Sequence, residues 1–369
     1  MQVAVLGGGH GGYAAAADLA LAGHAVRFWR RSAADLEAIR QAGGLTLIAE
    51  EGQRRATLAL ATSDLAEAIL GAEVIVVALP ATAHEDLAHR LAPHLDDGQV
   101  VLLTPGTLGA YVLAREITRA GGRPPLAIAE TGTLPYLARK TGPTEVRVAV
   151  RADNLPLGVF PAARSRPVLA KVAALYPAAR ACVNVLDAAL TNAGPALHGP
   201  LVLVNAGAID RGAFDIHAAG TTASARRLIE AVDGERMAAR AGWRYPAPHY
   251  ELATYYDDAR AAQGLYGIGA RAKLTASGLW SEPLTFEHRY VTEDVALGLS
   301  LFESAARTVG VESPAISGLL LIFGALLGRP LSGQGRALEA LGLGELLLRE
   351  IQALLVEGWT SPLWSRVIK

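Results

Sequence analysis

A run of glycines near the start of the chain is the feature that most constrains its fold. The apolar segment Gln2–Leu6 leads directly into GGGHGG at residues 7–12, and a stretch with helical composition follows. A strand, a glycine turn and a helix in this order are typical of the first unit of a parallel sheet. In such a unit Gly7 allows the tight turn, Gly9 leaves room for a diphosphate, and Gly12 lets the helix pack close to the strand.

This loop therefore predicts a dinucleotide-binding site. The start of the helix would offer free N–H groups and the positive end of its dipole to the diphosphate. The alternative is a glycine-rich turn that binds nothing, but the position between a strand and a helix favours the binding site. The predicted cofactor-binding residues of the loop are Gly7, Gly9, His10, Gly11 and Gly12.

Short apolar runs alternate with amphipathic stretches through the first half of the chain. The predicted strands are Gln2–Leu6, Ala25–Trp29, Val74–Leu79 and Val100–Leu103, and the predicted helices are Gly11–Ala22, Ala33–Ala42, Leu65–Leu70 and Asp86–Leu95. A hairpin, Leu45–Ile48 with Arg55–Ala61, is expected as an insertion. Strands that are apolar on both faces indicate a parallel sheet covered by helices on both sides.

The second half has a different pattern, which is long, apolar and helical from about Asp187 onward. Its predicted helices are Leu197–Ala208, Ala218–Ala241, Val295–Thr308, Ala315–Leu327 and Glu345–Glu357. A chain of 369 residues is also long for a single core. The sequence thus predicts an α/β fold: a Rossmann-type doubly wound parallel sheet over residues 1–186, followed by an all-helical second domain over residues 187–369.

Composition narrows the class of partner. The chain has 34 basic and 35 acidic residues, so it lacks the global field that favours nucleic acids or anionic membranes, and small molecules are the expected partners. The apolar stretch Ala315–Leu327 is too short to span a bilayer. A single cysteine, Cys182, excludes an internal disulfide. The single cysteine and the lack of a charged leader segment at the start together favour a cytoplasmic location. No metal site is predicted, and assembly into a homodimer is left open.

The end of the second strand, Trp29-Arg30-Arg31-Ser32, bears on the choice of cofactor. An acidic residue there would accept the ribose 2′-hydroxyl of NAD, whereas two guanidinium groups and a hydroxyl suit the 2′-phosphate of NADP. The sequence therefore predicts NADP, with NAD as the alternative. A solvated basic turn, with Trp29 or an arginine stacked on the adenine, is the other interpretation.

Two later loops follow strands at the same edge of the predicted sheet. They contribute Leu79 and Pro80 after one strand and Thr104, Pro105 and Gly106 after the next. Ligands of open α/β sheets lie beyond the carboxyl ends of the strands, so these residues are expected to line the nicotinamide side of the site. Both loops could equally be ordinary turns.

Polar residues in the second half stand out against an apolar background. His198 lies in an almost wholly apolar helical stretch, where it is either a hydrogen-bonded core histidine or a catalytic group. Thr292 is a plausible N-cap, with carboxylates following it in the first turn. Arg289 would then lie on the loop that enters the helix. Arg289 and Asp294 could point into one site, although a capping motif beside a surface ion pair would look the same.

These segments together resemble the octopine/nopaline (opine) dehydrogenase family. The glycine loop is similar to the opening of that family, Ala129–Tyr136 resembles the segment after its later Rossmann strands, and Asn192–His198 resembles the stretch with its catalytic histidine. Arg289-Tyr-Val-Thr-Glu-Asp294 resembles its Arg-x-x-x-Glu-Asp element. The likeness covers nearly the whole chain in the right order, and it favours the catalytic interpretation of His198.

The resemblance implies NAD(P)H-dependent reductive condensation of an amino acid with a 2-oxo acid, which yields a secondary amine with two carboxylates. It implies that His198 is the acid/base and Asp294 its carboxylate partner. It implies that Arg289 binds a substrate carboxylate and that Glu130 and Thr131 lie near the substrates. The segment Tyr245–Ser281 matches nothing in the family, so the amino acid is left open.

Two alternatives compete with this interpretation. Glycerol-3-phosphate and ketopantoate reductases share the layout of a Rossmann domain followed by helices, but those families use a lysine of the second domain. Only Lys273 stands there before the terminal Lys369, and Lys171 lies just before the domain. A dinucleotide sensor without catalysis is the second alternative, and such a protein would not need His198, Arg289 and Asp294 together.

Overall fold

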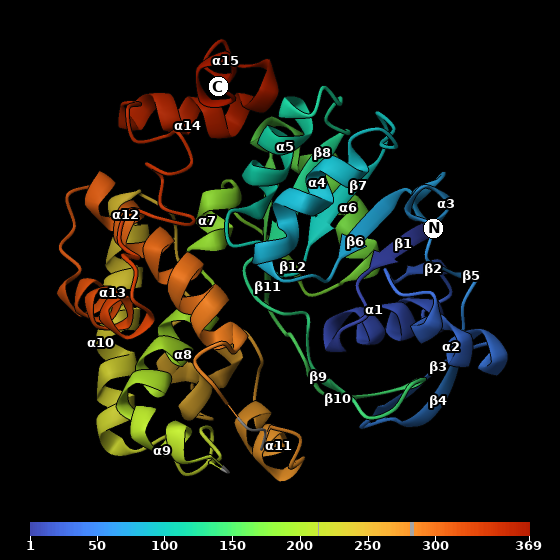
Figure 1. The fold of residues 1–369 in the computed structure, drawn as a ribbon, viewed down its shortest axis with the longest axis horizontal. Helices are drawn as coiled ribbons and strands as arrows, with labels where there is room; N and C mark the ends of the chain where they lie inside the picture. The colour runs from blue at the N-terminus through green and yellow to red at the C-terminus, as the bar shows by residue number, and fades with distance from the viewer. Residues whose placement is uncertain (213, 281–283) are drawn as a thin grey trace.

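The computed structural model, which describes residues 1–212, 214–280 and 284–369, has a sheet domain beside a helical domain (Figure 1). The main sheet has eight strands in the order β12-β11-β8-β7-β6-β1-β2-β5. All neighbours are parallel except β11, which runs antiparallel to β8. The strands are β1 Gln2–Leu6, β2 Ala25–Trp29, β5 Leu60–Thr62, β6 Val74–Val77, β7 Val100–Leu103, β8 Ala127–Thr131, β11 Leu155–Phe160 and β12 Ala179–Ala181.

The strand order places the predicted cofactor loops together. The chain moves outward from β1 to β2 and β5, then returns to the other side of β1 as β6. This reversal is a topological switch point, where open sheets bind ligands at the carboxyl ends of the strands. The glycine loop after β1 and the loop after β6 both lie at this point.

Helices cover both faces of the sheet, as the unbroken apolar strands predict. Buried side chains of α3, α4 and α5 pack on one face, while α1, α2 and α6 pack on the other. The bounds are α1 His10–Leu21, η1 Ala34–Leu36, α2 Glu37–Ala42, α3 Leu65–Ile69, η2 Ala81–Ala83, α4 His84–Leu91, α5 Gly109–Arg119, η3 Ala162–Arg164 and α6 Ser165–Leu175. The doubly wound arrangement expected from the sequence is confirmed.

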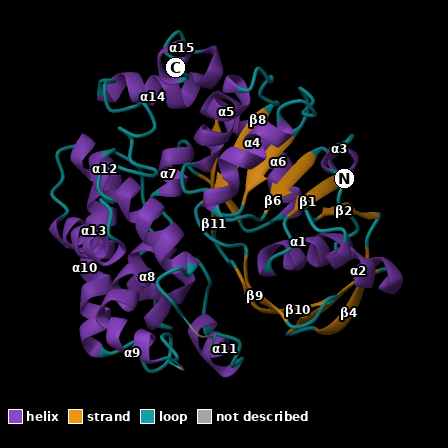
Figure 2. Cartoon of the chain, in the orientation of Figure 1, coloured by secondary structure: helices purple, strands orange, loops and turns teal. Residues whose placement is uncertain are grey.

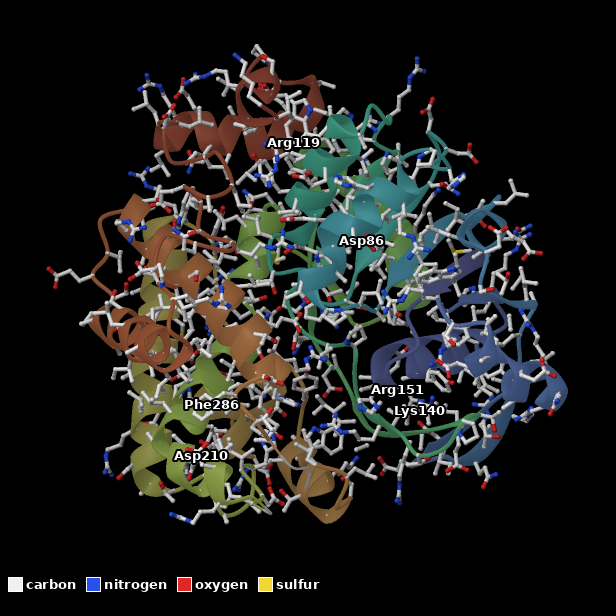
Figure 3. All side chains as sticks on the ribbon, viewed as in Figure 1. Asp86, Arg119, Lys140, Arg151, Asp210 and Phe286 are labelled. Carbon is white, nitrogen blue, oxygen red and sulfur yellow. The ribbon has the colours of Figure 1, made fainter. Side chains whose placement is uncertain are left out.

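A second, four-stranded sheet lies against α1, in the order β4-β3-β10-β9. Its strands are β3 Gly44–Ala49, β4 Gly52–Thr57, β9 Tyr136–Lys140 and β10 Glu145–Arg151. Lys140 and Arg151 extend from it beside α1 (Figure 3), and Arg151 forms an ion pair with Asp18 of α1 at 2.8 Å. The predicted hairpin corresponds to β3 and β4, but its second arm ends earlier because Leu60–Thr62 joins the main sheet as β5.

The helical domain occupies the other half of the molecule (Figure 2). It comprises α7 Val185–Ala189, α8 Ala193–Val204, α9 Ala206–Arg211, α10 Ala223–Gly242, η4 Leu252–Tyr256, η5 Ala261–Gln263, α11 Ala270–Ala276, η6 Tyr290–Leu299, α12 Ser300–Thr308 and α13 Pro314–Leu327. The helices η6 and α12 are continuous. No helix within the described residues is both long enough and apolar enough to cross a bilayer.

The carboxyl-terminal helices return to the sheet domain (Figure 1). These are α14 Leu348–Glu357, η7 Gly358–Thr360 and α15 Trp364–Val367. The Trp364 ring lies 5.6 Å from Phe160 of β11 and 5.9 Å from Tyr111 of α5, and Arg119 donates to the Ile368 carbonyl at 2.8 Å. The sequence assigned residues 187–369 to one helical domain, whereas the last helices pack on the sheet domain. Helical periodicity reveals that a helix has an apolar face, but not which domain will cover that face.

Candidate active site

His198 and Asp294 form a close pair between two helices of the helical domain. His198 lies on α8, which is N-capped by Asn192, whose side chain accepts from the Gly194 N–H at 3.0 Å. Asp294 lies on η6, and its carboxylate is 2.7 Å from Nδ1 of His198. Their side chains are 17% and 10% exposed, so water screens the pair only weakly. Because Nδ1 is engaged, Nε2 is the ring nitrogen that can exchange a proton with a substrate.

Glycines allow the two helices to approach this closely. A Cβ atom at Gly194 would lie 2.6 Å from Oδ1 of Asp294, closer than carbon and oxygen can pack. A Cβ atom at Gly298 of η6 would collide with the Pro195 side chain of α8. The distance between His198 and Asp294 therefore depends on both glycines.

The winding of η6 brings Arg289 and Asp294 to one cavity. The predicted N-cap at Thr292 is wrong: the helix begins at Tyr290, Arg289 already has helical backbone angles, and the Thr292 hydroxyl donates to the His288 carbonyl at 3.4 Å. In an α-helix, residues five apart would point in different directions. However, η6 is a π-helix with i to i+5 hydrogen bonds, and its wider turn brings residues five apart closer to the same side of the helix.

An aromatic and imidazole cluster surrounds His198. The Tyr290 ring stacks on the His198 ring, with centroids 3.6 Å apart and planes 14° from parallel. The Tyr290 hydroxyl and Nε2 of His217 share a hydrogen bond at 2.9 Å. Burial, with the nearby imidazoles and Arg139, lowers the pKa of His217 to about 3, so that ring is neutral. Sequence reasoning missed Tyr290, although it directly follows Arg289.

A cavity of about 230 Å³ connects this cluster to the sheet domain. His10, Gly11 and Pro105 line it from the sheet domain, and His198, Arg289 and Asp294 line it from the helical domain. The structure thus brings the three residues of the predicted catalytic set together, next to part of the predicted cofactor site. A group of three histidine, cysteine or acidic residues placed to hold a metal ion is absent from the described residues.

The glycine loop fits a bound diphosphate. Gly7 has φ +131°, and a Cβ atom there would collide with the Ala78 carbonyl, while one at Gly12 would collide with the Gly7 carbonyl. Gly9 instead faces open space, with nothing within 4 Å of a Cβ atom. Within the described chain no side chain caps the start of α1, and its first turn contains no acidic residue. Its N–H groups and dipole are therefore available to an anion.

The basic turn after β2 is partly engaged within the protein. Arg30 donates to the Tyr13 hydroxyl at 2.7 Å and pairs with Asp35 at 2.7 Å, a carboxylate that sequence reasoning did not consider. Arg31 and Ser32 are exposed, and the Ser32 hydroxyl accepts from the Asp35 N–H at 3.4 Å. Trp29 is buried and donates to the Ser63 carbonyl at 3.0 Å, which makes it a core residue rather than a platform for adenine.

The loops after β6 and β7 hold the two domains together. Glu293 of η6 accepts from the Ala81 N–H at 2.8 Å and lies 3.2 Å from Arg289, and the buried Arg336 donates to the Ala81 carbonyl at 2.8 Å. Leu79 is partly buried and Pro80 is exposed beside this contact. In the second loop, Thr104 is buried and Gly106 packs on Glu130, so Pro105 is the residue of that loop that lines the cavity.

Glu130 and Thr131 do not reach the cavity surface. Glu130 is fully buried, and its two oxygens accept from the N–H groups of Leu108 and Ala110, each at 2.8 Å. Burial raises its pKa to about 7 against the opposing effect of these two donors. The Thr131 hydroxyl donates to the Thr133 carbonyl at 2.7 Å. Glu130 thus supports the segment after β7, and Thr131 supports the turn after β8.

Comparison with known proteins agrees with this layout. The model of the NAD/NADP octopine/nopaline dehydrogenase alpha-helical domain matches residues 181–327. An opine dehydrogenase of Arthrobacter sp. (strain 1C) is 31% identical over 364 residues, which cover 95% of this chain and 97% of that protein. The chain belongs to the opine dehydrogenase family. It is therefore an NAD(P)-dependent dehydrogenase that condenses an amino acid with a 2-oxo acid.

Solved structures of opine dehydrogenases share the fold. Octopine dehydrogenase in complex with NADH and agmatine has a TM-score of 0.71 and 20% identity over 96% of this chain and 98% of its own. Yersinopine dehydrogenase with NADP⁺ bound has a TM-score of 0.61 and 14% identity over 98% and 99%. One relative thus binds NADH and the other NADP⁺, so membership of the family establishes a dinucleotide cofactor without deciding which one.

The competing interpretations are not favoured. The amino-terminal model of NAD-dependent glycerol-3-phosphate dehydrogenases matches residues 2–109, which lie within the cofactor domain. Lys273, the lysine that a reductase of that type would need, is half-exposed and pairs with Glu50 at 2.6 Å. Lys171 is partly exposed and donates to the Gly98 carbonyl at 3.3 Å. Neither lysine is among the residues that line the cavity.

Proposed function

We propose that His198, Asp294 and Arg289 carry the condensation of the two substrates. The observation that supports this most directly is the 2.7 Å contact between His198 and Asp294, at a cavity that also includes the glycine loop. The amine must lose a proton to attack the oxo group, and the oxygen must gain one to leave as water. An imidazole can accept the first proton and donate the second. Asp294 holds its tautomer and stabilises the imidazolium form.

Arg289 is suited to the carboxylate of the 2-oxo acid. A guanidinium offers two parallel donors, which match a carboxylate better than an ammonium group does. Glu293 lies 3.2 Å from Arg289 and binds the loop after β6, so it orients the arginine relative to the cofactor domain. The bound nicotinamide supplies the hydride that reduces the imine. Contact between the domains would exclude the water that hydrolyses it.

Glu130 is proposed to act through the segment after β7 that it supports, and Thr131 through the turn after β8. Glu130 holds the Leu108 and Ala110 N–H groups, and the neighbouring Thr107 hydroxyl accepts from Asn192, the cap of α8, at 3.4 Å. This chain of contacts runs from the sheet to the helix that bears His198. Direct contact of these two side chains with substrate stays a prediction from the family resemblance.

We further propose that NADPH is preferred over NADH. The support is Arg31, exposed beside Arg30 at the end of β2, where the adenosine ribose of a Rossmann cofactor lies. Replacing Arg31 with glutamine should weaken NADPH binding about tenfold or more and change NADH binding little, since a hydrogen bond to a charged group contributes ~1.5–3 kcal/mol. Arg123→Gln is the matched control, because Arg123 is exposed and precedes β8, at the amino ends of the strands and away from the cofactor loops. Equal affinities of the unaltered protein for both cofactors would refute this preference.

The reaction itself is tested by cofactor oxidation. A panel of amino acids is crossed with pyruvate, oxaloacetate and 2-oxoglutarate, each with NADPH and with NADH. Oxidation that requires both an amino acid and a 2-oxo acid is the expected result, with a secondary amine identified as product by mass spectrometry. Oxidation with the 2-oxo acid alone would indicate simple ketone reduction and refute the proposal. A homodimeric assembly and a cytoplasmic location stay predictions from the sequence.

A further inference from the structure

The cavity extends beyond His198, Arg289 and Asp294 to a wall from another part of the helical domain. This wall comes from residues 250–274 and consists of the side chains of Tyr250, Leu252, Tyr255, Leu265, Tyr266 and Leu274, which we call the apolar wall. Tyr250, Leu252, Leu265 and Leu274 are each less than a tenth exposed. It lies within Tyr245–Ser281, the segment in which the sequence showed no recognisable family motif; Ser281 itself is outside the described residues.

We propose that the apolar wall is the side-chain subsite for the amino-acid substrate, and that this substrate is a neutral amino acid with an apolar side chain. The proposal rests on the proposed function, because it assumes that an amino acid reacts at His198. It adds the chemical class of that amino acid.

The carboxylates around the cavity are already committed. Glu251 pairs with Arg260, Glu293 pairs with Arg289, and Asp294 pairs with His198. The described lining therefore contains no uncommitted carboxylate for an ammonium or guanidinium side chain. Such a side chain would lose its hydration against apolar atoms without gaining an ion pair, which is costly.

The hydroxyl groups of the apolar wall offer little to a polar side chain. The Tyr266 hydroxyl shares a hydrogen bond with Thr133 at 2.7 Å and donates to the Leu134 carbonyl at 3.1 Å. Burial raises the pKa of Tyr255 and Tyr266 further above physiological pH, so neither phenol offers a charge to a substrate. These aromatic rings therefore present mainly apolar surface to a substrate.

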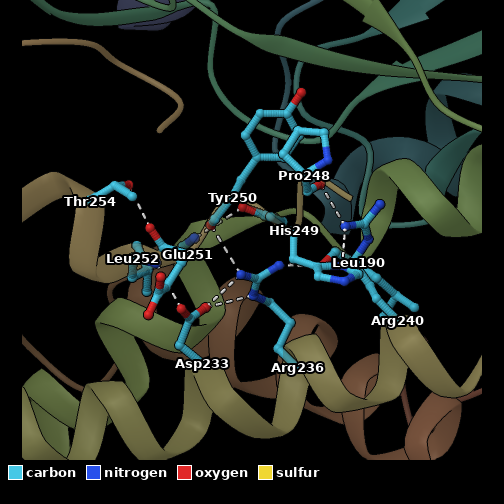
Figure 4. Close-up of polar contacts among 12 residues, drawn as sticks. Leu190, Asp233, Arg236, Arg240, Pro248, His249, Tyr250, Glu251, Leu252 and Thr254 are labelled. Atoms are coloured by element: carbon cyan, nitrogen blue, oxygen red, sulfur yellow. Dashed lines mark hydrogen bonds and ion pairs between the residues drawn. The ribbon is translucent and has the colours of Figure 1, made fainter. Parts of the chain in front are cut away.

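Buried arginines of α10 hold this part of the wall in place (Figure 4). Arg236 is fully buried and donates to the carbonyls of Leu190 at 2.8 Å and Tyr250 at 3.1 Å. Its partner Asp233, 2.7 Å away, accepts from the Leu252 N–H at 2.7 Å. Tyr250 has φ +53°, a conformation that costs a tyrosine free energy and persists only when its surroundings impose it. The wall is therefore preformed, which favours selection by side-chain shape.

The wild-type enzyme tests the proposal with a graded series of amino acids at fixed pyruvate and NADPH. Alanine, 2-aminobutyrate, norvaline and norleucine differ by one methylene each, and kcat/KM should rise about fourfold per methylene until the wall is filled. Lysine is norleucine with a terminal ammonium group and is the matched comparison. It should react at least about a hundredfold more slowly, and so should arginine.

The outcomes separate the two proposals. Turnover that favours lysine, arginine or glutamate over norleucine, or a flat response to chain length, overturns the apolar subsite and leaves the condensation reaction standing. Turnover with no amino acid of the panel overturns the proposed function, and the subsite with it. Either result is read directly from the rate of cofactor oxidation.

A charge placed in the wall tests its position. Leu274→Glu on α11 should raise the ratio of lysine to norleucine kcat/KM by about tenfold or more, because it supplies the missing carboxylate. Ile268→Glu is the control: Ile268 belongs to the same segment, is 67% exposed and does not line the cavity, so the ratio should not change. An unchanged ratio in a folded Leu274→Glu enzyme would place the substrate side chain elsewhere.

Discussion

Replacing Asp294 with asparagine should slow turnover about tenfold to 150-fold without changing cofactor binding. The carboxylate lies 2.7 Å from Nδ1 of His198, and both side chains are less than a fifth exposed. A hydrogen bond to a charged group contributes ~1.5–3 kcal/mol, and ~1.4 kcal/mol corresponds to a factor of ten in rate. Asparagine keeps the shape of the side chain but cannot stabilise the imidazolium form of His198.

His198→Ala should cost more, about a hundredfold to ten-thousandfold, because it removes the group that transfers the proton. The double variant should be little worse than His198→Ala alone, since Asp294 acts through the imidazole. The assay is kcat at saturating substrates for the wild type, both single variants and the double. Titration of the cofactor reports on folding, and Asp210→Asn on the exposed face of α9 is the matched control. Losses that multiply in the double variant, or near-normal turnover of His198→Ala, would refute the idea of one catalytic unit.

Three further predictions follow from contacts around the site. Gly194→Ala should lower kcat at least about tenfold, because the new Cβ atom would lie 2.6 Å from Asp294 Oδ1 and displace that carboxylate. The control is Gly234→Ala in α10, where a Cβ atom meets open space: kcat should not change, and the helix should be stabilised by ~1 kcal/mol. Glu293→Gln keeps an acceptor for the loop after β6 but loses the negative charge that orients Arg289, the proposed ligand of the 2-oxo acid. The KM for the 2-oxo acid should therefore rise more than kcat falls, and an unchanged KM would contradict this. Burial raises the pKa of Glu130 from 4.5 to about 7 in the folded state, so its ionisation favours the unfolded state as pH rises between those values. Glu130→Gln removes this effect, and its free energy of unfolding relative to that of the wild type should therefore increase by ~3 kcal/mol from pH 4.5 to pH 7, measured by denaturant unfolding. Parallel pH profiles of the two proteins would show that the pKa of this carboxyl is not raised.

Local patterns in the sequence were sufficient for β1, β2, β6 and β7 of the main sheet and for the choice of candidate site residues, but not for β8, β11 and β12. The order of strand, glycine loop and helix depends on backbone sterics within about twenty residues, and β1, α1 and β2 appear where the pattern predicts them. Apolar periodicity predicted α10, η6 with α12, α13 and α14, but it joined α8 and α9 into one helix that began four residues late, and it missed α7 and α11. The residue types of His198, Arg289 and Asp294 were informative because ionisable groups are rare against that apolar background.

Only the tertiary structure decided how these residues meet. His198 and Asp294 are 96 positions apart, and their contact depends on the packing of α8 against η6. The π-helical winding that aligns Arg289 with Asp294 was not predicted, because propensity and periodicity describe α-helices and strands.

Local sequence patterns also did not determine which side chains are buried. Glu130 was expected near the substrates, yet it lies beneath a loop with both oxygens bound to backbone N–H groups. The apolar wall comes from a segment without a recognisable motif. Helix α14 packs on the sheet domain, although its position in the chain suggested the helical domain. A residue's neighbours in sequence determine its local conformation through sterics and hydrogen bonding. Its burial, its charge partners and the cavity that it lines depend on segments hundreds of residues away, which meet only when the apolar faces of both domains pack together.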